Sequence, residues 1–318
     1  MPRYLVTGGA GFIGSTFIRH LLGTDPDATV TNLDLLTYAG LHANVAELDQ
    51  DDRHEFVHGD VADAALVDTL MDGIDIVVNF AAESHVDRSI AGPAVFLRSN
   101  ILGTGVLLDA ARRRHVPTFV QVSSDEVYGP VPTGAADEEA PLRPSSPYAA
   151  SKAAADMVVA SYRHTYGYEA IVTRSTNNYG PYQHPEKLIP LAITRLLEGG
   201  VVPVYGDGKH EREWLWVDDH VAAIRLLIDE GTPGETYNIG SGEQCENLDV
   251  VERLIGLVGS GSMEHVTDRP GHDRRYGLDT AKLRALGWKP TVDLDEGLAR
   301  TVAWYREHRD WWEPLVTR

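Results

Sequence analysis

The fold is decided by residues 7 to 14, which are Thr7-Gly8-Gly9-Ala10-Gly11-Phe12-Ile13-Gly14. An apolar, strand-like run at 4–7 leads into this stretch, and a helix-like pattern follows it. Glycines at such a strand-to-helix turn let the backbone approach a pyrophosphate at the N-terminus of the helix. A tight turn that binds nothing would use the same residues, so the neighbouring sequence has to decide between the two interpretations.

An acidic residue at a suitable distance favours the ligand-binding interpretation. Asp34 ends the second predicted strand, about 20 residues after the last glycine, where a carboxylate can accept a hydrogen bond from a ribose 2′-hydroxyl. A carboxylate there disfavours a 2′-phosphate, so we expect NAD rather than NADP as the cofactor. Asp60, after the third predicted strand, is placed for a contact with the adenine.

Strand-like and helix-like segments alternate beyond the glycine turn. Strands are predicted at 4–7, 30–33, 55–57, 74–80, 119–123 and 170–174. They are apolar on both faces and their connections are long enough for crossover helices, so we predict an α/β fold with a Rossmann-type doubly wound parallel sheet. We expect an NAD-binding domain at 1–175, with about 214–237 returning to it. A smaller C-terminal α/β substrate lobe is expected at 176–213 and 238–318.

Composition excludes several classes of protein. The chain has 318 residues, of which 43% are hydrophobic and 24% charged, as in a folded globular protein rather than a disordered one. No apolar run approaches the roughly 18 residues of a membrane span, and no signal-peptide pattern opens the chain, so we expect a cytoplasmic protein. The net charge of −19 argues against binding to nucleic acid or to an anionic membrane.

A tyrosine and a lysine form the first candidate catalytic pair. Tyr148 and Lys152 lie four residues apart in a predicted helix at 148–166, so they share one face of it. An ammonium group there can lower the pKa of the phenol and let Tyr148 act as a base near neutral pH. The spacing alone is common on protein surfaces. The glycine turn upstream, and Ser123 and Ser124 at the end of a central strand, favour a catalytic role.

Two carboxyl groups follow that strand directly. Asp125 and Glu126 can act as an acid and a base if their surroundings separate their pKa values, although acidic residues of a solvated turn would look the same. A basic cluster at 269–276, with Lys187 and Arg212, can neutralise a substrate pyrophosphate, or can pair with local acids.

No metal site is expected. The stretch His54-Glu55-Phe56-Val57-His58 matches the HExxH pattern of zinc peptidases. That chemistry needs a helix, which places both histidines against one metal, whereas these residues lie in a predicted strand. The single cysteine, Cys245, has no second thiol for a disulfide or a zinc site.

The chain resembles the extended short-chain dehydrogenase/reductase family, and within it the sugar-nucleotide 4,6-dehydratases. The resemblance covers nearly the whole chain. Its matching segments are TGGAGFIGS at 7–15, LTYAG at 36–40, FVHGD at 56–60, AAESHVDRSI at 81–90, SDEVYG at 124–129, SPYAASK at 146–152, NNYGPYQHPEKLIP at 177–190, YGDG at 205–208, YNIG at 237–240 and DRPGHDRRY at 268–276.

This resemblance implies a lyase that removes water from dTDP-glucose, with the hydride passing from C4 to C6 through NAD. Tyr148 is expected to take the C4 hydroxyl proton, with Lys152 tuning it and holding the nicotinamide ribose. Glu126 is expected to take the C5 proton, and Asp125 to protonate the departing C6 hydroxyl. Ser124 is expected to hydrogen-bond the sugar O4.

The resemblance also implies binding residues, position by position. Those expected at NAD are Gly8, Gly11, Phe12, Ile13, Gly14, Asp34, Thr37, Asp60, Val61, Ala81, Ala82, Ser84, Asn100, Tyr148, Lys152 and Asn178. Those expected at the sugar nucleotide are Ser84, Ser124, Asn177, Glu186, Lys187, Leu188, Pro203, Tyr205, Arg212, Asn238, His272, Arg275 and Tyr276.

Some alternatives stay open. The chain departs from its relatives at Leu35, at Leu41 and within 211–214. The changes near 209–216 touch the expected nucleotide pocket and leave the preferred nucleobase open. A UDP-sugar dehydratase or 4-epimerase is the nearest other enzyme, and a non-catalytic NAD-binding sensor is a more distant one. A homodimer is expected through a four-helix interface made by the predicted helices at 100–115 and 148–166.

Overall fold

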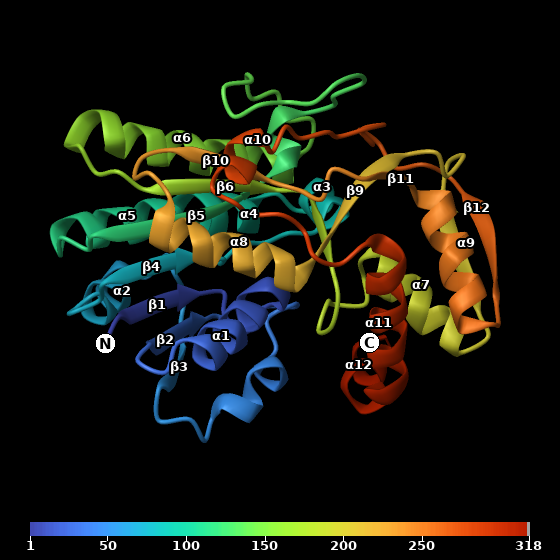
Figure 1. Cartoon of the computed structure of the whole chain (residues 1–318), viewed down its shortest axis with the longest axis horizontal. Helices are drawn as coiled ribbons and strands as arrows, with labels where there is room; N and C mark the ends of the chain where they lie inside the picture. Colours follow the sequence, from blue (N-terminus) through green and yellow to red (C-terminus); the bar gives the residue numbers. More distant parts are fainter. Residues whose placement is uncertain (317–318) are drawn as a thin grey trace.

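A parallel sheet of seven strands forms the larger part of the computed structural model, which describes residues 1–316 (Figure 1). The strand order is β10-β6-β5-β4-β1-β2-β3, and every pairing is parallel. The strands are β1 Arg3–Thr7, β2 Thr29–Asp34, β3 His54–His58, β4 Ile76–Asn79, β5 Thr118–Ser124, β6 Ile171–Ser175 and β10 Thr236–Ile239. The predicted Rossmann-type sheet is confirmed.

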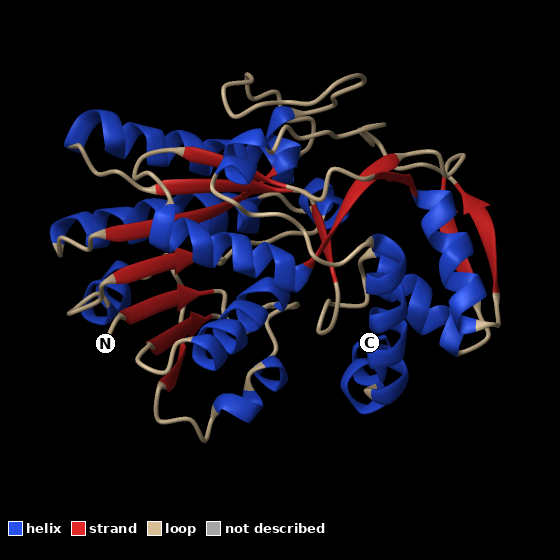
Figure 2. Ribbon diagram, in the orientation of Figure 1, coloured by secondary structure: helices blue, strands red, loops and turns tan. Residues whose placement is uncertain are grey.

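Helices cover both faces of this sheet (Figure 2). In β1, Tyr4 and Val6 belong to a core formed with α1 and α8, whereas Leu5 belongs to a core formed with α2, α5 and α6. Successive residues of a strand point to opposite faces, which is why the strands are apolar throughout. The helices concerned are α1 Phe12–Thr24, α2 Ala64–Leu70, α5 Thr104–Arg113, α6 Pro147–Tyr166 and α8 Val217–Glu230.

Helix α6 has clear signals at both ends. The Ser146 hydroxyl accepts a hydrogen bond from Ala149 N at 3.1 Å, Pro147 occupies the first turn, and Gly167 ends the helix in the left-handed conformation. A serine N-cap, an early proline and a terminal glycine are the preferred residues at those positions. The predicted helix at 148–166 is therefore confirmed.

The helix predicted at 100–115 begins earlier and is not regular. It starts at α4 Ala94–Phe96, continues as a π-helical stretch η3 Leu97–Gly103 and ends as α5. Asn100 lies in the π-helical stretch, and its side chain bonds to the backbone of Glu83. A π-helical turn of this kind is often found at functional sites, and hydrophobic periodicity does not reveal it.

Two smaller sheets and four helices form a second lobe. Strands β7 Asn177–Tyr179, β9 Glu211–Trp216 and β11 Gln244–Glu246 make one sheet, and β8 Val201–Tyr205 pairs with β12 Ser262–Val266. A separate hydrophobic cluster joins these strands to the helices α7 Leu188–Leu197, α9 Asn247–Val258, α11 Leu294–Glu307 and α12 Arg309–Val316. The remaining short elements are α3 Val86–Ala91, α10 Ala281–Ala285, η1 His42–Asn44, η2 Ala46–Leu48 and η4 Asp125–Tyr128.

One helical stretch in the described part of the chain, residues 94–113, is long and apolar enough to cross a membrane. That test uses length and composition only, and 44% of the stretch is buried inside the protein. The core helix of a soluble protein passes the same test, so this is weak evidence for a membrane span.

Candidate active site

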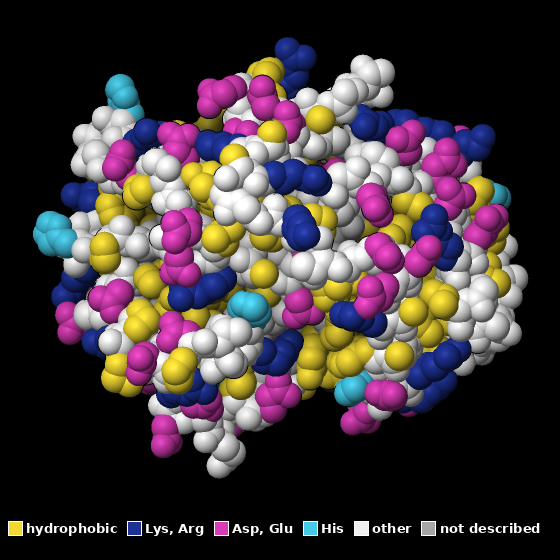
Figure 3. All heavy atoms as spheres, viewed as in Figure 1, with side chains coloured by type: hydrophobic (Ala, Val, Ile, Leu, Met, Phe, Trp, Pro, Cys, Tyr) yellow, Lys and Arg dark blue, Asp and Glu magenta, His cyan; other side chains and the backbone are white. Residues whose placement is uncertain are grey.

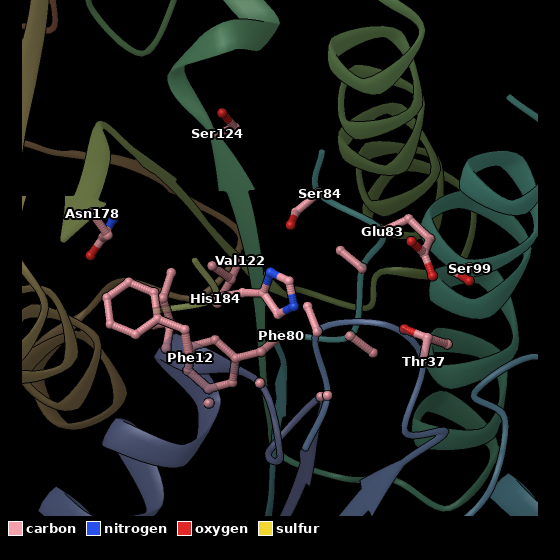
Figure 4. A pocket seen from close by; sticks show the side chains of 18 of the residues that line it. Phe12, Thr37, Phe80, Glu83, Ser84, Ser99, Val122, Ser124, Asn178 and His184 are labelled. Atoms are coloured by element: carbon pink, nitrogen blue, oxygen red, sulfur yellow. The ribbon is translucent and has the colours of Figure 1, made fainter. Parts of the chain in front are cut away.

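The site lies where the strand order of the large sheet reverses. β1 pairs with β2 on one side and with β4 on the other, so the loops after β1 and β4 diverge at the carboxyl edge of the sheet. A crevice at such a reversal is the usual ligand site of an open α/β sheet. The cavity found there is lined from both lobes, as Figure 4 shows: Phe12 and Asn178 lie on one side and Thr37, Glu83 and Ser99 on the other.

The glycine turn forms one wall of this cavity. Gly8 has a φ of +70°, and a Cβ atom there would lie 2.6 Å from the Ala81 nitrogen. A Cβ on Gly14 would overlap the Gly8 carbonyl oxygen. Only glycine gives a backbone cradle of this shape next to the first turn of α1, and such a cradle fits the pyrophosphate of a dinucleotide.

Asp34 is held in place at the adenosine end. Its carboxylate accepts hydrogen bonds from Ala10 N at 2.9 Å and from Leu36 N at 2.8 Å. Burial raises the pKa of this carboxyl group, and the two N–H groups partly oppose that rise. Among the described residues that line the cavity, the lysines are Lys152 and Lys187, which belong to the opposite end. The residues around Asp34 therefore fit the ribose of NAD better than a 2′-phosphate.

Asp60 also lines the cavity, but its carboxylate has protein partners already. Oδ2 accepts from Arg98 Nη2 at 2.8 Å and from Arg98 Nε at 3.0 Å, and Oδ1 accepts from Ala62 N at 2.8 Å. The expected contact of Asp60 with the adenine stays a prediction.

The structure brings Tyr148 and Lys152 to the cavity, beside the end of β5. The Lys152 ammonium donates to the Val122 carbonyl at 2.6 Å, and burial lowers the pKa of Lys152 to about 8. The pKa of Tyr148 is raised, chiefly by burial and then by the charge of Glu126, while a hydrogen bond with Ser124 lowers it. Desolvation and the Glu126 charge thus outweigh the Ser124 hydrogen bond at the phenol, and the expected lowering of its pKa by Lys152 stays a prediction.

Asp125 and Glu126 lie in contrasting surroundings. Asp125 is buried, and its Oδ2 atom has no hydrogen-bond partner in the described structure. Burial, then Glu126 and Glu213, hold the pKa of Asp125 well above its usual range. The pKa of Glu126 is also raised by burial, but Arg269, Arg212 and Lys187 oppose the rise. The neighbouring charges therefore favour the protonated form at Asp125 more than at Glu126, which is the difference that an acid and base pair requires.

Most of the predicted residues meet in this cavity. They are Gly8, Gly11, Phe12, Ile13, Gly14, Asp34, Thr37, Asp60, Val61, Ala81, Ala82, Ser84, Ser124, Asp125, Glu126, Tyr148, Lys152, Asn177, Asn178, Glu186 and Lys187. Residues that sequence reasoning missed also line it, among them Tyr38, Glu83, Ser99, Gln183 and His184. All but Ser99 lie in the matching segments quoted above, so those segments carried a signal that was not assigned to single residues.

Asn100 lies behind the cavity instead of lining it. Its Oδ1 accepts from Glu83 N at 2.9 Å, and its Nδ2 donates to Glu83 O at 3.1 Å and to the Ser151 hydroxyl at 2.8 Å. Asn100 therefore fixes the backbone at Glu83, which faces the cavity. A direct contact with NAD is not what this geometry favours.

The structure does not bring Asn238 or Arg275 to the cavity. The Asn238 amide donates to the carbonyls of Ala136 and Asp279 and accepts from the Tyr128 hydroxyl. Arg275 donates to the carbonyls of two loop residues and pairs with Glu211 at 3.3 Å. These partners give both side chains a structural role in joining the two lobes, so their expected contact with the substrate has no support from this geometry.

Arg212 and Tyr276 lie close to the carboxyl pair but outside the residues that line the cavity. The Arg212 guanidinium lies over the Tyr276 ring at 4.6 Å, and donates to the Asp273 carbonyl at 2.9 Å. Leu188 begins α7, Pro203 and Tyr205 lie in β8, and the Tyr205 hydroxyl donates to Asp87 at 3.4 Å. These positions surround the side of the cleft that belongs to the second lobe.

His272 belongs to a small cluster with His210 and Asp268. Potential ligand atoms of these three side chains lie within 4.8 Å of one another. The Asp268 carboxylate already bridges the two rings, with 2.7 Å to His272 Nδ1 and 3.3 Å to His210 Nε2. Asp268 thus occupies one nitrogen of each ring, while the buried His210 Nδ1 has no hydrogen-bond partner among the described residues. The HExxH stretch forms β3, where histidines four residues apart lie about 13 Å apart along the strand and cannot share a metal.

Known proteins resemble this chain over nearly its whole length. A family model described as GDP-mannose 4,6 dehydratase matches residues 5–301. Two dTDP-glucose 4,6-dehydratases, from Streptomyces niveus and Streptomyces antibioticus, are 52% and 53% identical over 98% and 99% of this chain and 95% of each relative.

Solved structures give the same picture. DesIV from Streptomyces venezuelae, a dTDP-glucose 4,6-dehydratase with NAD and TYD bound, is 53% identical, covers 98% of this chain and 99% of its own, and gives a TM-score of 0.96. A UDP-glucose 4-epimerase from Thermus thermophilus in complex with NAD is 33% identical, covers 96% and 99%, and gives a TM-score of 0.89.

Proposed function

The chain belongs to the GDP-mannose 4,6-dehydratase family, and from that premise we propose that it is an NAD-dependent dTDP-glucose 4,6-dehydratase. The reaction converts dTDP-glucose to dTDP-4-keto-6-deoxyglucose and water, a step of deoxysugar biosynthesis. The choice of dTDP-glucose, rather than the substrate in the family's name, is supported by relatives that are more than 50% identical over nearly the whole chain.

One observation carries the proposal: Asp125 and Glu126 stand side by side at the end of β5, within the cavity that also holds Tyr148. An epimerase that only oxidises and reduces C4 needs the tyrosine but has no use for a second acid and base. The elimination of water across C5 and C6 needs one group to take a proton and one to give a proton. Burial raises the pKa of both carboxyl groups, but three basic side chains oppose the rise at Glu126, whereas two carboxylates add to it at Asp125, and this difference supports an acid role for Asp125 and a base role for Glu126.

The proposed steps use the side chains in a fixed order. Tyr148 takes the C4 hydroxyl proton, and Ser124, at the same strand end, hydrogen-bonds the sugar O4. The resulting C4 ketone makes the C5 proton acidic, so Glu126 removes it while Asp125 protonates the C6 hydroxyl, which leaves as water. NAD, bound along the glycine turn, would supply the hydride chemistry, with a hydride passing from C4 to C6 while Glu126 returns a proton to C5.

Lysine and arginine side chains serve the two ends of the substrate pocket. Lys152 donates to the Val122 carbonyl at 2.6 Å within the cavity, which supports a role for its ammonium group at the nicotinamide ribose. Lys187 donates to the Ser84 carbonyl at 2.8 Å, and both Lys187 and Arg269 act on the charge of Glu126. With Arg212 they supply the positive charge that a sugar-nucleotide pyrophosphate needs in a chain of net charge −19.

The division into domains and the oligomeric state belong to the proposal. Residues 1–175 with 214–237 form the NAD-binding part, and 176–213 with 238–318 form the sugar-nucleotide lobe. Large exposed hydrophobic side chains gather on α4, η3 and α6: Val95, Leu97, Leu102, Met157 and Tyr166 are each at least 50% exposed. A second copy of the chain that covers this face gives a homodimer. The long apolar stretch at 94–113 then serves the dimer and not a membrane, in keeping with a cytoplasmic location.

Three sugar nucleotides test the proposal: dTDP-glucose, UDP-glucose and GDP-mannose, each incubated with the protein and NAD. We expect loss of water, seen by mass spectrometry, with dTDP-glucose as the preferred substrate. Preferred dehydration of another sugar would contradict the substrate. An epimerised product of unchanged mass would contradict the reaction class.

A further inference from the structure

We propose that Trp311, on the C-terminal helix α12, is a positioning residue for the dinucleotide turn and slows the release of NAD. It acts through Asn44, which joins the last helix of the chain to the first loop of the sheet. This inference rests on the proposed NAD-binding function. It concerns a residue far from the reacting atoms and outside every segment used to identify the site.

Two hydrogen bonds make the connection. The Trp311 indole Nε1 donates to Asn44 Oδ1 at 2.9 Å, and Asn44 Nδ2 donates to the Ala10 carbonyl at 2.8 Å. Asn44 is 1% exposed, so neither bond can be replaced easily by water. Because both ends of the amide have a partner, the orientation of the Asn44 side chain is fixed.

Ala10 is buried in the glycine turn, between Gly8 and Gly11, which line the cavity. Ala10 N donates to Asp34 Oδ2 at 2.9 Å, and the Ala10 carbonyl also accepts from Leu41 N at 3.0 Å. Ala10 is thus held between the ribose-binding carboxylate on one side and Asn44 on the other. A weaker hydrogen bond from Asn44 would therefore make both the glycine turn and the Asp34 side chain less rigid.

Aromatic packing holds the indole itself. Trp311 contacts Tyr182 at 5.8 Å and Trp304 at 5.1 Å between ring centroids. Arg19, from α1, lies 4.1 Å over the Tyr182 ring and donates to the Asn44 carbonyl at 2.6 Å. Side chains from both lobes therefore surround this one amide. Hydrophobic side chains are visible at this junction between the lobes in Figure 3.

The hydrogen bonds from Trp311 through Asn44 affect how long NAD stays bound during catalysis. The proposed reaction regenerates NAD in every turnover, so the cofactor can stay bound while the sugar nucleotide enters and leaves. A hydrogen bond between α12 and the turn makes the rate of NAD release depend on the docking of the C-terminal helix. It does so without any contact between Trp311 and NAD.

The test is the release rate of NAD labelled in its adenine, chased with excess unlabelled NAD in the absence of sugar nucleotide. Trp311→Phe keeps an aromatic ring but removes the N–H donor. Trp288→Phe is the matched control, because Trp288 Nε1 donates to the Asp219 carbonyl at 3.1 Å and not to Asn44. We expect release about 3- to 10-fold faster for Trp311→Phe and unchanged for Trp288→Phe.

A double variant separates positioning from general loosening. If Trp311 acts through Asn44, then Trp311→Phe adds little to the release rate of Asn44→Ala, and kcat at saturating NAD stays near that of the parent. Equal release rates for Trp311→Phe and the parent would overturn the proposal, as would equal acceleration in both tryptophan variants. The dehydratase assay on the same samples reports the proposed function separately.

Discussion

Asp125 and Glu126 are neighbours in the chain, but after burial the largest charge effects on Asp125 come from Glu126 and Glu213, and those on Glu126 come from Arg269 and Arg212. Acidic neighbours thus dominate around the first carboxyl group and basic neighbours around the second. Both residues open the η4 turn, in which Asp125 is buried and Glu126 is half-buried. A turn of solvated acidic residues would not separate them in this way.

Removal of either carboxyl group should stop dehydration and leave C4 oxidation in place. We expect Asp125→Asn and Glu126→Gln to lower the rate of water loss by about 10²- to 10⁴-fold, because each removes one general acid or base. NADH should then accumulate and be visible by its absorbance. If both variants dehydrate dTDP-glucose at the parent rate, the assigned roles are wrong.

The glycine turn should not tolerate a methyl group at its first position. Gly8→Ala places a side chain at a φ of +70° and within 2.6 Å of the Ala81 nitrogen. We expect the free energy of unfolding in urea to fall by at least about 1 kcal/mol, with loss of bound NAD. Gly23→Ala is the control: no atom within 4 Å would meet its Cβ. It should raise stability by about 0.5 kcal/mol.

Acid should weaken the fold through His220. Burial lowers the pKa of His220 to about 3, from 6.5, and its Nδ1 bonds to Asn178 Oδ1 at 2.9 Å. The unfolded chain takes up a proton below pH 6.5, whereas the folded protein does not until about pH 3, so stability falls as the pH falls through this window. Between pH 7 and pH 5, protonation of this histidine in the unfolded chain lowers the free energy of unfolding by about 2 kcal/mol.

The matched variant is His220→Gln, which does not titrate. Its free energy of unfolding in urea should fall by about 2 kcal/mol less than that of the parent between the same pH values. Parallel losses in the two proteins would show that His220 is not the group responsible.

A charge on the exposed apolar face should separate the proposed dimer. Leu102 and Met157 are 50% and 62% exposed, on η3 and α6. We expect Leu102→Glu and Met157→Glu to give the mass of a monomer in light scattering at micromolar concentration, while the parent gives the mass of a dimer. Leu257→Glu, on α9 at 39% exposed, should leave the dimer intact. A monomeric parent would refute the dimer.

Local patterns were enough to predict the sheet and the floor of the cavity. The six predicted strands all occur, because a strand buried on both faces leaves a continuous apolar run. The glycine turn, Tyr148 and Lys152 were predicted because their chemistry depends on short spacings. The helix was predicted to begin at 100 and not at 94, and its π-helical stretch was not predicted. That stretch is held by a hydrogen bond between Asn100 and the backbone of Glu83, which is distant in the sequence.

The features that sequence patterns did not predict depend on contacts between residues that are far apart in the chain. The pKa of Tyr148 depends on burial and on the position of Glu126, neither of which follows from the spacing to Lys152. Asn238 was expected at the substrate, but its amide is taken up by the carbonyls of Ala136 and Asp279. Trp311 and Asn44 are 267 positions apart, so no sequence pattern connects them.

The central claim is tested most directly by a reaction in deuterated water. The protein is mixed with dTDP-glucose, and the product is followed by NMR and mass spectrometry. The account predicts a product that has lost one water and carries one solvent deuterium at C5, because Glu126 exchanges the proton that it removes there. The hydrogen from C4 should appear at C6 without exchange. A product that has lost no water, or that has lost water without deuterium at C5, would contradict the account.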